Sequence, residues 1–150
     1  HHLLRRQRQM CIRDRATGIA LADLLVSKNS GEMGDMLGVD IIVTYSSWPR
    51  EWQKEADWLR FKKEGGMTRE VISHFIFFTE RVLGPLKVIW ANTSYPTDPE
   101  LCETSVFAKL ENKDGLPVNI FASVGDELWP SPSITPLPLL HVLVGGGVWS

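Results

Sequence analysis

The sequence predicts an α+β fold, an open and mostly antiparallel sheet covered on one face by helices. Three observations predict it: several segments alternate apolar and polar residues as strands do, one glycine-bounded segment between them has a helical period, and no G-x-G-x-x-G turn follows a strand. A chain of 150 residues, 43% hydrophobic and 23% charged, can bury one core. We therefore expect one α+β domain, with the nucleotide-binding Rossmann domain absent.

The domain is expected to occupy residues 16–125, between two segments of different character. Residues 1–15 carry five arginines and no periodic pattern, and they are similar to a translated sequencing adapter at the edge of an assembled metagenomic fragment; the alternative is a basic arm that binds an acidic partner. Residues 126–150 form a proline-rich irregular tail without a charged residue after Glu127. A shifted reading frame explains that tail, and so does a native docking segment. If residues 1–15 are not native, the chain is the middle or end of a longer gene.

Composition narrows the classes of partner. The formal net charge is -2, and no basic surface in residues 16–125 is typical of phosphate binding, so we expect neither nucleic acid nor a membrane as partner. No apolar run approaches the roughly 20 residues of a membrane span. Cys11 and Cys102 lie far apart and outside any metal-ligand spacing, so we expect reduced thiols, no metal and a cytoplasmic location.

Four segments have the pattern of strands. One runs from Val39 to Tyr45, a second from Leu86 to Ala91, and a hairpin joins residues 103–110 to residues 116–124 through the Asp114-Gly115 turn. One face of the hairpin alternates as a core face does. The other face carries Phe107, Lys109 and Phe121, which is apolar enough to predict that a second subunit covers it.

The segment from Gly66 to Leu83 has a helical period. Its apolar residues form one stripe, and an α-helical projection places Glu70 and His74 together along the edge of that stripe. An imidazole poised near neutral pH can take the proton of an alcohol, and a carboxylate one turn away can orient the ring. The alternative is an ordinary Glu–His pair on a solvated helix face.

Two glycines precede this helix. Gly65 and Gly66 allow a sharp turn that brings the first amides of the helix close to a ligand, either the nicotinamide end of a cofactor or a substrate oxygen. The alternative is a plain start to the helix.

A loop of about twenty residues after Ser47 combines aromatic and cationic residues. Tryptophan rings beside an arginine can stack on a sugar and hold its hydroxyls, so we predict four substrate-binding residues: Trp48, Arg50, Trp52 and Trp58. In the alternative interpretation the tryptophans pin the loop to the sheet.

The pattern GG-x3-E-x3-H formed by Gly65, Gly66, Glu70 and His74 resembles the GGG-x3-D-x3-H signature in the C-terminal domain of the Gfo/Idh/MocA family of NAD(P)-dependent oxidoreductases. The flanking segments GEMGDMLGVDIIVTYSSWPREWQKEADWLRF and E-x3-FAKLENKDGLPVNIFAS are similar to the same domain, so the resemblance covers roughly residues 16–125. Two positions depart from the signature, because Glu64 replaces the first glycine and Glu70 replaces the aspartate.

The resemblance implies that the chain is a fragment of the substrate-binding and oligomerisation domain. The parent enzyme would act on the CH–OH group of a sugar or polyol, with His74 as the acid or base and Glu70 in support. NAD(P) would be bound mainly by an N-terminal Rossmann domain missing from this chain, so the fragment alone would be inactive, and the exposed sheet face would form a homo-oligomer. The alternative is a non-catalytic ligand-binding or dimerisation module with a packed His74. In a third possibility within the family, the hydride chemistry serves a different net reaction, such as glycoside cleavage.

Overall fold

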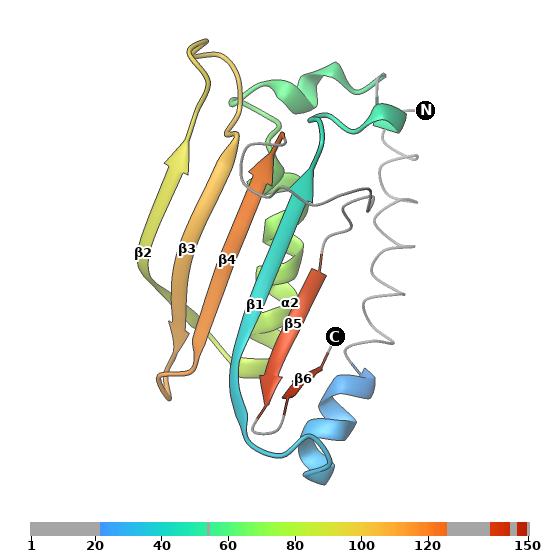
Figure 1. The fold of residues 1–150 in the computed structure, drawn as a ribbon, viewed down its shortest axis with the longest axis vertical. Coiled ribbons are helices and arrows are strands. Elements are labelled where there is room, and N and C mark those ends of the chain that lie inside the picture. The colour runs from blue at the N-terminus through green and yellow to red at the C-terminus, as the bar shows by residue number, and fades with distance from the viewer. Residues whose placement is uncertain (1–21, 54, 126–138, 145–146, 150) are drawn as a thin grey trace.

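The computed structural model describes residues 22–53, 55–125, 139–144 and 147–149. Residues 22–30 are helical and precede the first strand (Figure 1). The elements that follow are β1 (Met36–Tyr45), the 3-10 turns η1 (Glu51–Gln53) and η2 (Asp57–Arg60), the π-helix η3 (Thr68–Ile72), α2 (Ser73–Leu83), β2 (Leu86–Ser94), β3 (Ser105–Asn112), β4 (Pro117–Val124), β5 (Leu139–Val144) and β6 (Gly147–Trp149).

The strands form one mixed sheet in the order β2-β3-β4-β1-β5-β6. β1 and β4 pair in parallel, with Ile41 opposite Ile120, and every other neighbouring pair is antiparallel. The predicted α+β class and the four predicted strands are therefore confirmed. The parallel pair requires a crossover between β1 and β4, and the helix lies on that crossover.

The expectation of an irregular tail is wrong at residues 139–144 and 147–149. These residues form β5 and β6, and β5 pairs with β1 from Met36 to Ile42. The reason is the free edge of β1, whose backbone donors and acceptors need partners that the apolar run at residues 139–144 can supply. Residues 1–15, with Cys11, and residues 126–138 lie outside the described residues.

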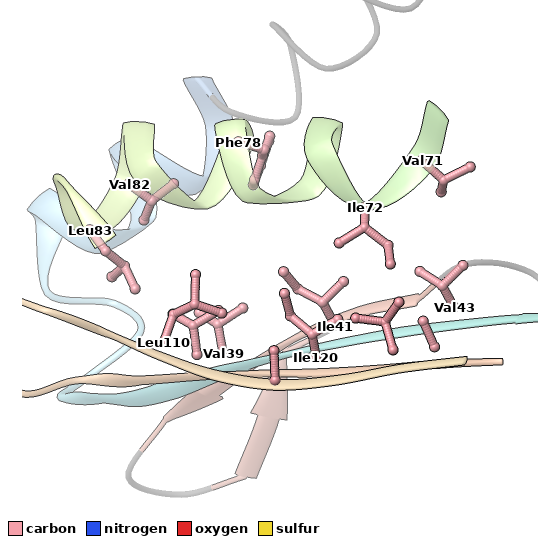
Figure 2. Close-up of a cluster of buried hydrophobic side chains, with 14 of the residues drawn as sticks. Val39, Ile41, Val43, Val71, Ile72, Phe78, Val82, Leu83, Leu110 and Ile120 are labelled. Atoms are coloured by element: carbon pink, nitrogen blue, oxygen red, sulfur yellow. The ribbon is translucent and has the colours of Figure 1, made fainter. Parts of the chain in front are cut away.

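The core lies between one face of the sheet and the helical segment η3–α2. Figure 2 shows Val71 and Ile72 over Val43, and Leu83 over Leu110, so the helix runs antiparallel to β1. Alternation along the strands supplies the sheet side and the helical period supplies the other, as predicted. The buried members that Figure 2 labels are Val39, Ile41, Val43, Val71, Ile72, Phe78, Val82, Leu83, Leu110 and Ile120.

Two side chains close the carboxyl end of α2, which ends at Gly84 with φ +81°. Lys28 Nζ donates to the carbonyl of Val82 at 2.7 Å, and Asn112 Nδ2 donates to the carbonyl of Leu83 at 3.1 Å. These contacts satisfy carbonyls that have no partner within the helix. Neither this helix nor any other in the described part of the chain is long and apolar enough to span a membrane.

Replacement of Ile41 by alanine tests the core. Ile41 is 0% exposed in the central strand β1, so Ile41→Ala should lower the free energy of unfolding by about 2–5 kcal/mol through lost burial and a residual cavity. The same substitution at Ile89, which is 46% exposed on β2, should cost at most about 1 kcal/mol. Urea denaturation followed by circular dichroism measures both, and equal costs would contradict this packing.

Candidate functional site

The turn before the helix is buried and requires its two glycines. The amide of Gly65 donates to the carbonyl of Phe61 at 2.8 Å, and the amide of Gly66 donates to the carbonyl of Leu59 at 2.9 Å. A Cβ on Gly65 would collide with the Leu59 carbonyl, and Gly66 has φ +102°, which L side chains rarely adopt. Close backbone packing therefore accounts for both glycines, and their role toward a cofactor stays a prediction.

A buried carboxylate lies at the start of the helical segment. Glu103 is 8% exposed, and its Oε1 accepts a hydrogen bond from the amide of Thr68 at 2.6 Å. Its Oε2 lies 2.7 Å from the position that a Cβ on Gly66 would take. Because the first amides of a helix carry partial positive charge, this is a favourable place for a buried carboxylate.

Glu70 and His74 lie on either side of a change in helix type. Glu70 is half-buried within η3, whereas His74 is exposed in the first turn of α2. A regular projection of 100° per residue does not hold across this junction, because a π-helix bonds residue i to residue i+5. Among the described residues, no hydrogen bond or ion pair joins the two side chains.

Three of the four predicted substrate-binding residues meet in an aromatic–arginine cluster formed by Tyr45, Trp48, Arg50 and Trp52. The guanidinium carbon of Arg50 lies 5.3, 5.7 and 4.7 Å from the ring centres of Tyr45, Trp48 and Trp52. Trp52 is 64% exposed, so one of these rings faces solvent. Trp58 lies half-buried in η2.

The cluster is tied to the glycine turn through Leu59, which is 1% exposed. The ring nitrogen of Trp48 donates to the Leu59 carbonyl at 2.9 Å, and the same carbonyl accepts the amide of Gly66. This bond ties Trp48 to another residue of the same loop, and its role toward a substrate stays a prediction. Trp52 remains available as a stacking surface.

The segment that carries Glu103 is paired to the loop before the helix. The amide of Cys102 donates to the carbonyl of Arg60 at 2.8 Å, and Phe61 forms an isolated antiparallel bridge with Leu101.

Burial, and then the charge of Glu103, raise the pKa of the Cys102 thiol to about 11, so the thiol is protonated at neutral pH.

The sheet face opposite α2 carries an aromatic pair. The rings of Phe107 and Phe121 lie edge to face with their centres 6.3 Å apart, and Phe121 is 45% exposed. Lys109 forms an ion pair with Glu111 at 3.0 Å on the same strand. Phe107 is half-buried, so Phe121 is the ring of this pair that is open to solvent, and the predicted cover by a second subunit stays a prediction.

Sequence reasoning missed Glu103 and Tyr45 as parts of this region. Nothing near Glu103 marks it as a helix cap, because Thr68 is 35 residues away in the chain. Tyr45 is the last residue of the predicted strand, and this end position was the signal that its ring could reach the loop. No cluster of three or more potential ligands among the described residues could hold a metal ion.

The solved structures that share this fold are oxidoreductases of the Gfo/Idh/MocA type, so the resemblance read from the sequence is confirmed at the level of the fold. Their identity to this chain is below 20%, which shows the fold alone. A scan against protein-family models found no match, and a search of the curated proteins found none either.

Three of these structures illustrate the likeness. A myo-inositol dehydrogenase from Corynebacterium glutamicum has a TM-score of 0.58 and 16% identity, over 86% of this chain and 36% of its own. The WlbA dehydrogenase of Bordetella pertussis, in complex with NADH and UDP-GlcNAcA, has a TM-score of 0.62 and 19% identity, over 89% and 38%. An Agrobacterium radiobacter oxidoreductase, in complex with NAD+, L-tartaric acid and magnesium, has a TM-score of 0.56 and 14% identity, over 86% and 41%. The chain thus spans little more than a third of each of them.

Substitution of Gly66 tests the glycine turn. Gly66→Ala should lower the free energy of unfolding by about 2–4 kcal/mol, because the added methyl group meets the Glu103 carboxylate in a strained backbone. Gly84→Ala is the matched control, since Gly84 also has a positive φ but has open space around it, and should cost about 1 kcal/mol. Thermal unfolding followed by calorimetry compares the two, and a cost at Gly66 no larger than at Gly84 would argue against the close packing.

Proposed function

We propose that this chain is the substrate-binding domain of an NAD(P)-dependent oxidoreductase that acts on the CH–OH group of a sugar or polyol. The observation that carries the proposal is the position of His74, exposed in the first turn of α2 directly after the π-helix η3. Short π segments are frequent at functional sites. The shared fold with dehydrogenases supports this assignment, and the exposure of the ring argues against the alternative of a non-catalytic module in which His74 is merely packed.

The proposed chemistry of this chain is proton transfer. Oxidation of an alcohol releases the hydroxyl proton as the carbonyl forms, and the His74 imidazole would accept it. In the reverse direction the imidazolium would return the proton to the new alkoxide. Glu70, half-buried one turn earlier, would orient the ring or bind a neighbouring hydroxyl.

NAD(P) would supply the hydride chemistry, held mainly by a separate nucleotide-binding domain. The fit of the glycine turn to that cofactor is restricted by Glu103. Its carboxylate takes the Thr68 amide and would repel a phosphate. The turn at Gly65 and Gly66 therefore fits the uncharged carboxamide of the nicotinamide end better than it fits the pyrophosphate.

The aromatic–arginine cluster would bind the substrate. Its exposed ring, Trp52, offers a flat apolar surface for the C–H face of a sugar or cyclic polyol. Arg50 is held against three rings and by a hydrogen bond from its Nε to Gln53 Oε1 at 2.9 Å, so its position is fixed before a ligand arrives.

The sheet face around Phe107 and Phe121 would be the homo-oligomer contact. A second copy would supply the same aromatic pair, as an isologous interface requires. This assignment is independent of the proton-transfer role, because the face lies on the side of the sheet opposite α2.

Removal of the imidazole tests the catalytic assignment. In a complete protein that carries this domain with its nucleotide-binding half, His74→Ala should reduce turnover by about two to four orders of magnitude with little change in melting temperature, because an exposed ring contributes little to packing. Turnover is measured with NAD+ and NADP+ against a panel of sugars and polyols that includes myo-inositol.

The control for that measurement is Glu80→Gln on the exposed side of the same helix, which should leave turnover within about twofold. Undiminished turnover of the His74→Ala protein would remove the acid/base role. An unrelated domain encoded upstream of residue 16, in place of a Rossmann domain, would favour the non-catalytic binding module.

A charge placed on the open sheet face tests the oligomer contact. Phe121→Lys should lower the sedimentation mass of the chain to that of a monomer, because a second copy would have to bury the ammonium group. Val88→Lys, also on an exposed apolar position but on the edge strand β2, should leave the mass unchanged. An unchanged mass for Phe121→Lys would end the proposal for this face.

A further inference from the structure

We infer that Glu103 is a positioning residue: its buried carboxylate fixes the start of η3 and thereby sets where Glu70 and His74 lie relative to each other. This inference rests on the proposed function, because it concerns the two side chains assigned to proton transfer. It adds a residue that belongs to neither the GG-x3-E-x3-H pattern nor the substrate loop.

The burial of Glu103 requires a compensating interaction. A carboxylate that is only 8% exposed loses most of its hydration, and the ion pairs of the described residues, Arg60 with Asp57 and Lys109 with Glu111, do not include it. The compensation comes from the start of the helical segment, where Oε1 accepts the Thr68 amide at 2.6 Å. This charge-assisted hydrogen bond is among the stronger kinds that proteins form.

The carboxylate is presented from a rigid part of the structure. On one side of Glu103, Cys102 is hydrogen-bonded to the carbonyl of Arg60. On the other side, the amide of Thr104 donates to the carbonyl of Ser94 at 2.9 Å, and the Thr104 carbonyl accepts the amide of Val124 at 2.8 Å. Glu103 is therefore held between the loop before the helix and the ends of strands β2 and β4.

The residues that Glu103 contacts decide where the π-helix begins. The carboxylate lies against Gly66, and the Gly66 carbonyl accepts the amide of Glu70 at 3.0 Å, which is the first bond of the helical segment. The bond to Thr68 holds the residue at which η3 begins. Because η3 gives way to α2 at Ser73, a shift at its start would rotate Glu70 relative to His74.

Nuclear magnetic resonance on the isotopically labelled 150-residue chain tests this inference without any substrate. In Glu103→Gln, the Thr68 amide should exchange with solvent about tenfold faster, since the remaining hydrogen bond lacks its charge. The backbone resonances of Glu70 and His74 should move, whereas those from Phe78 to Leu83 should keep their wild-type positions. Glu103→Asp, which keeps the charge on an arm one methylene shorter, should give smaller shifts in the same direction.

The matched control is Glu111→Gln, which removes a surface carboxylate from β3 and should leave the resonances of residues 66–74 unchanged. Unmoved resonances of Glu70 and His74 in Glu103→Gln would overturn the inference. Shifts spread evenly along the helix to Leu83 would also overturn it, since they indicate a merely structural role. If Glu103→Gln does not fold, Glu103→Asp decides: wild-type resonances at Glu70 and His74 would overturn the inference. This experiment measures resonances and not turnover. A failure of the positioning role of Glu103 is therefore distinguishable from a failure of the acid/base role of His74.

Discussion

One backbone carbonyl, that of Leu59, joins the two halves of the candidate site. It accepts hydrogen bonds from the Trp48 ring and from the Gly66 amide, both at 2.9 Å. A carbonyl oxygen has two lone pairs, and a buried one needs partners for them. Here one partner belongs to the aromatic–arginine cluster and the other to the start of the helix. The cluster and the start of the helix are therefore linked through one backbone atom, and Gly65 must lack a side chain so that the chain can pass this close to Leu59.

The topology of the sheet explains why these parts meet at one end of the molecule. β1 and β4 are parallel, and the crossover between them carries the loop, the helix, β2 and β3. The helix runs back along β1, as Figure 2 shows, so its start lies over the carboxyl ends of the parallel pair. Tyr45 ends β1 there, and its carbonyl accepts the amide of Gly125 just beyond β4 at 2.8 Å. One parallel pair thus gathers the aromatic rings, the glycine turn and the first turn of α2.

Local patterns could predict most of the fold because they report burial directly. Val39, Ile41 and Val43 alternate because one face of β1 packs on the helix, and the Asp114-Gly115 turn supplies its own φ +80°. The sequence could not predict the parallel pairing of β1 with β4 or the pairing of residues 139–144 with β1, because strand partners far apart in the chain leave no local signal. The exposure of β2 is also not visible in its local pattern: Val88 lies opposite the buried Leu110, yet on this edge strand it is 57% exposed.

At the candidate site, a physical cause also limits what the sequence could predict. A projection at 100° per residue assumes an α-helix, whereas Thr68–Ile72 is a π-helix whose start lies against Gly66 and the Glu103 carboxylate. The side-chain types of the pattern could be read from the sequence, whereas under the inference above their relative directions depend on a carboxylate that lies 35 residues further along the chain than Thr68. The exposure of His74 also has a consequence for the proposed chemistry. Hydride transfer needs a site that excludes water, and a ring on the outer side of a helix cannot exclude it alone. Under the proposed function, the surface that covers His74 must therefore come from the body that holds the cofactor, and this domain contributes the proton acceptor and the substrate surface to a site completed by both.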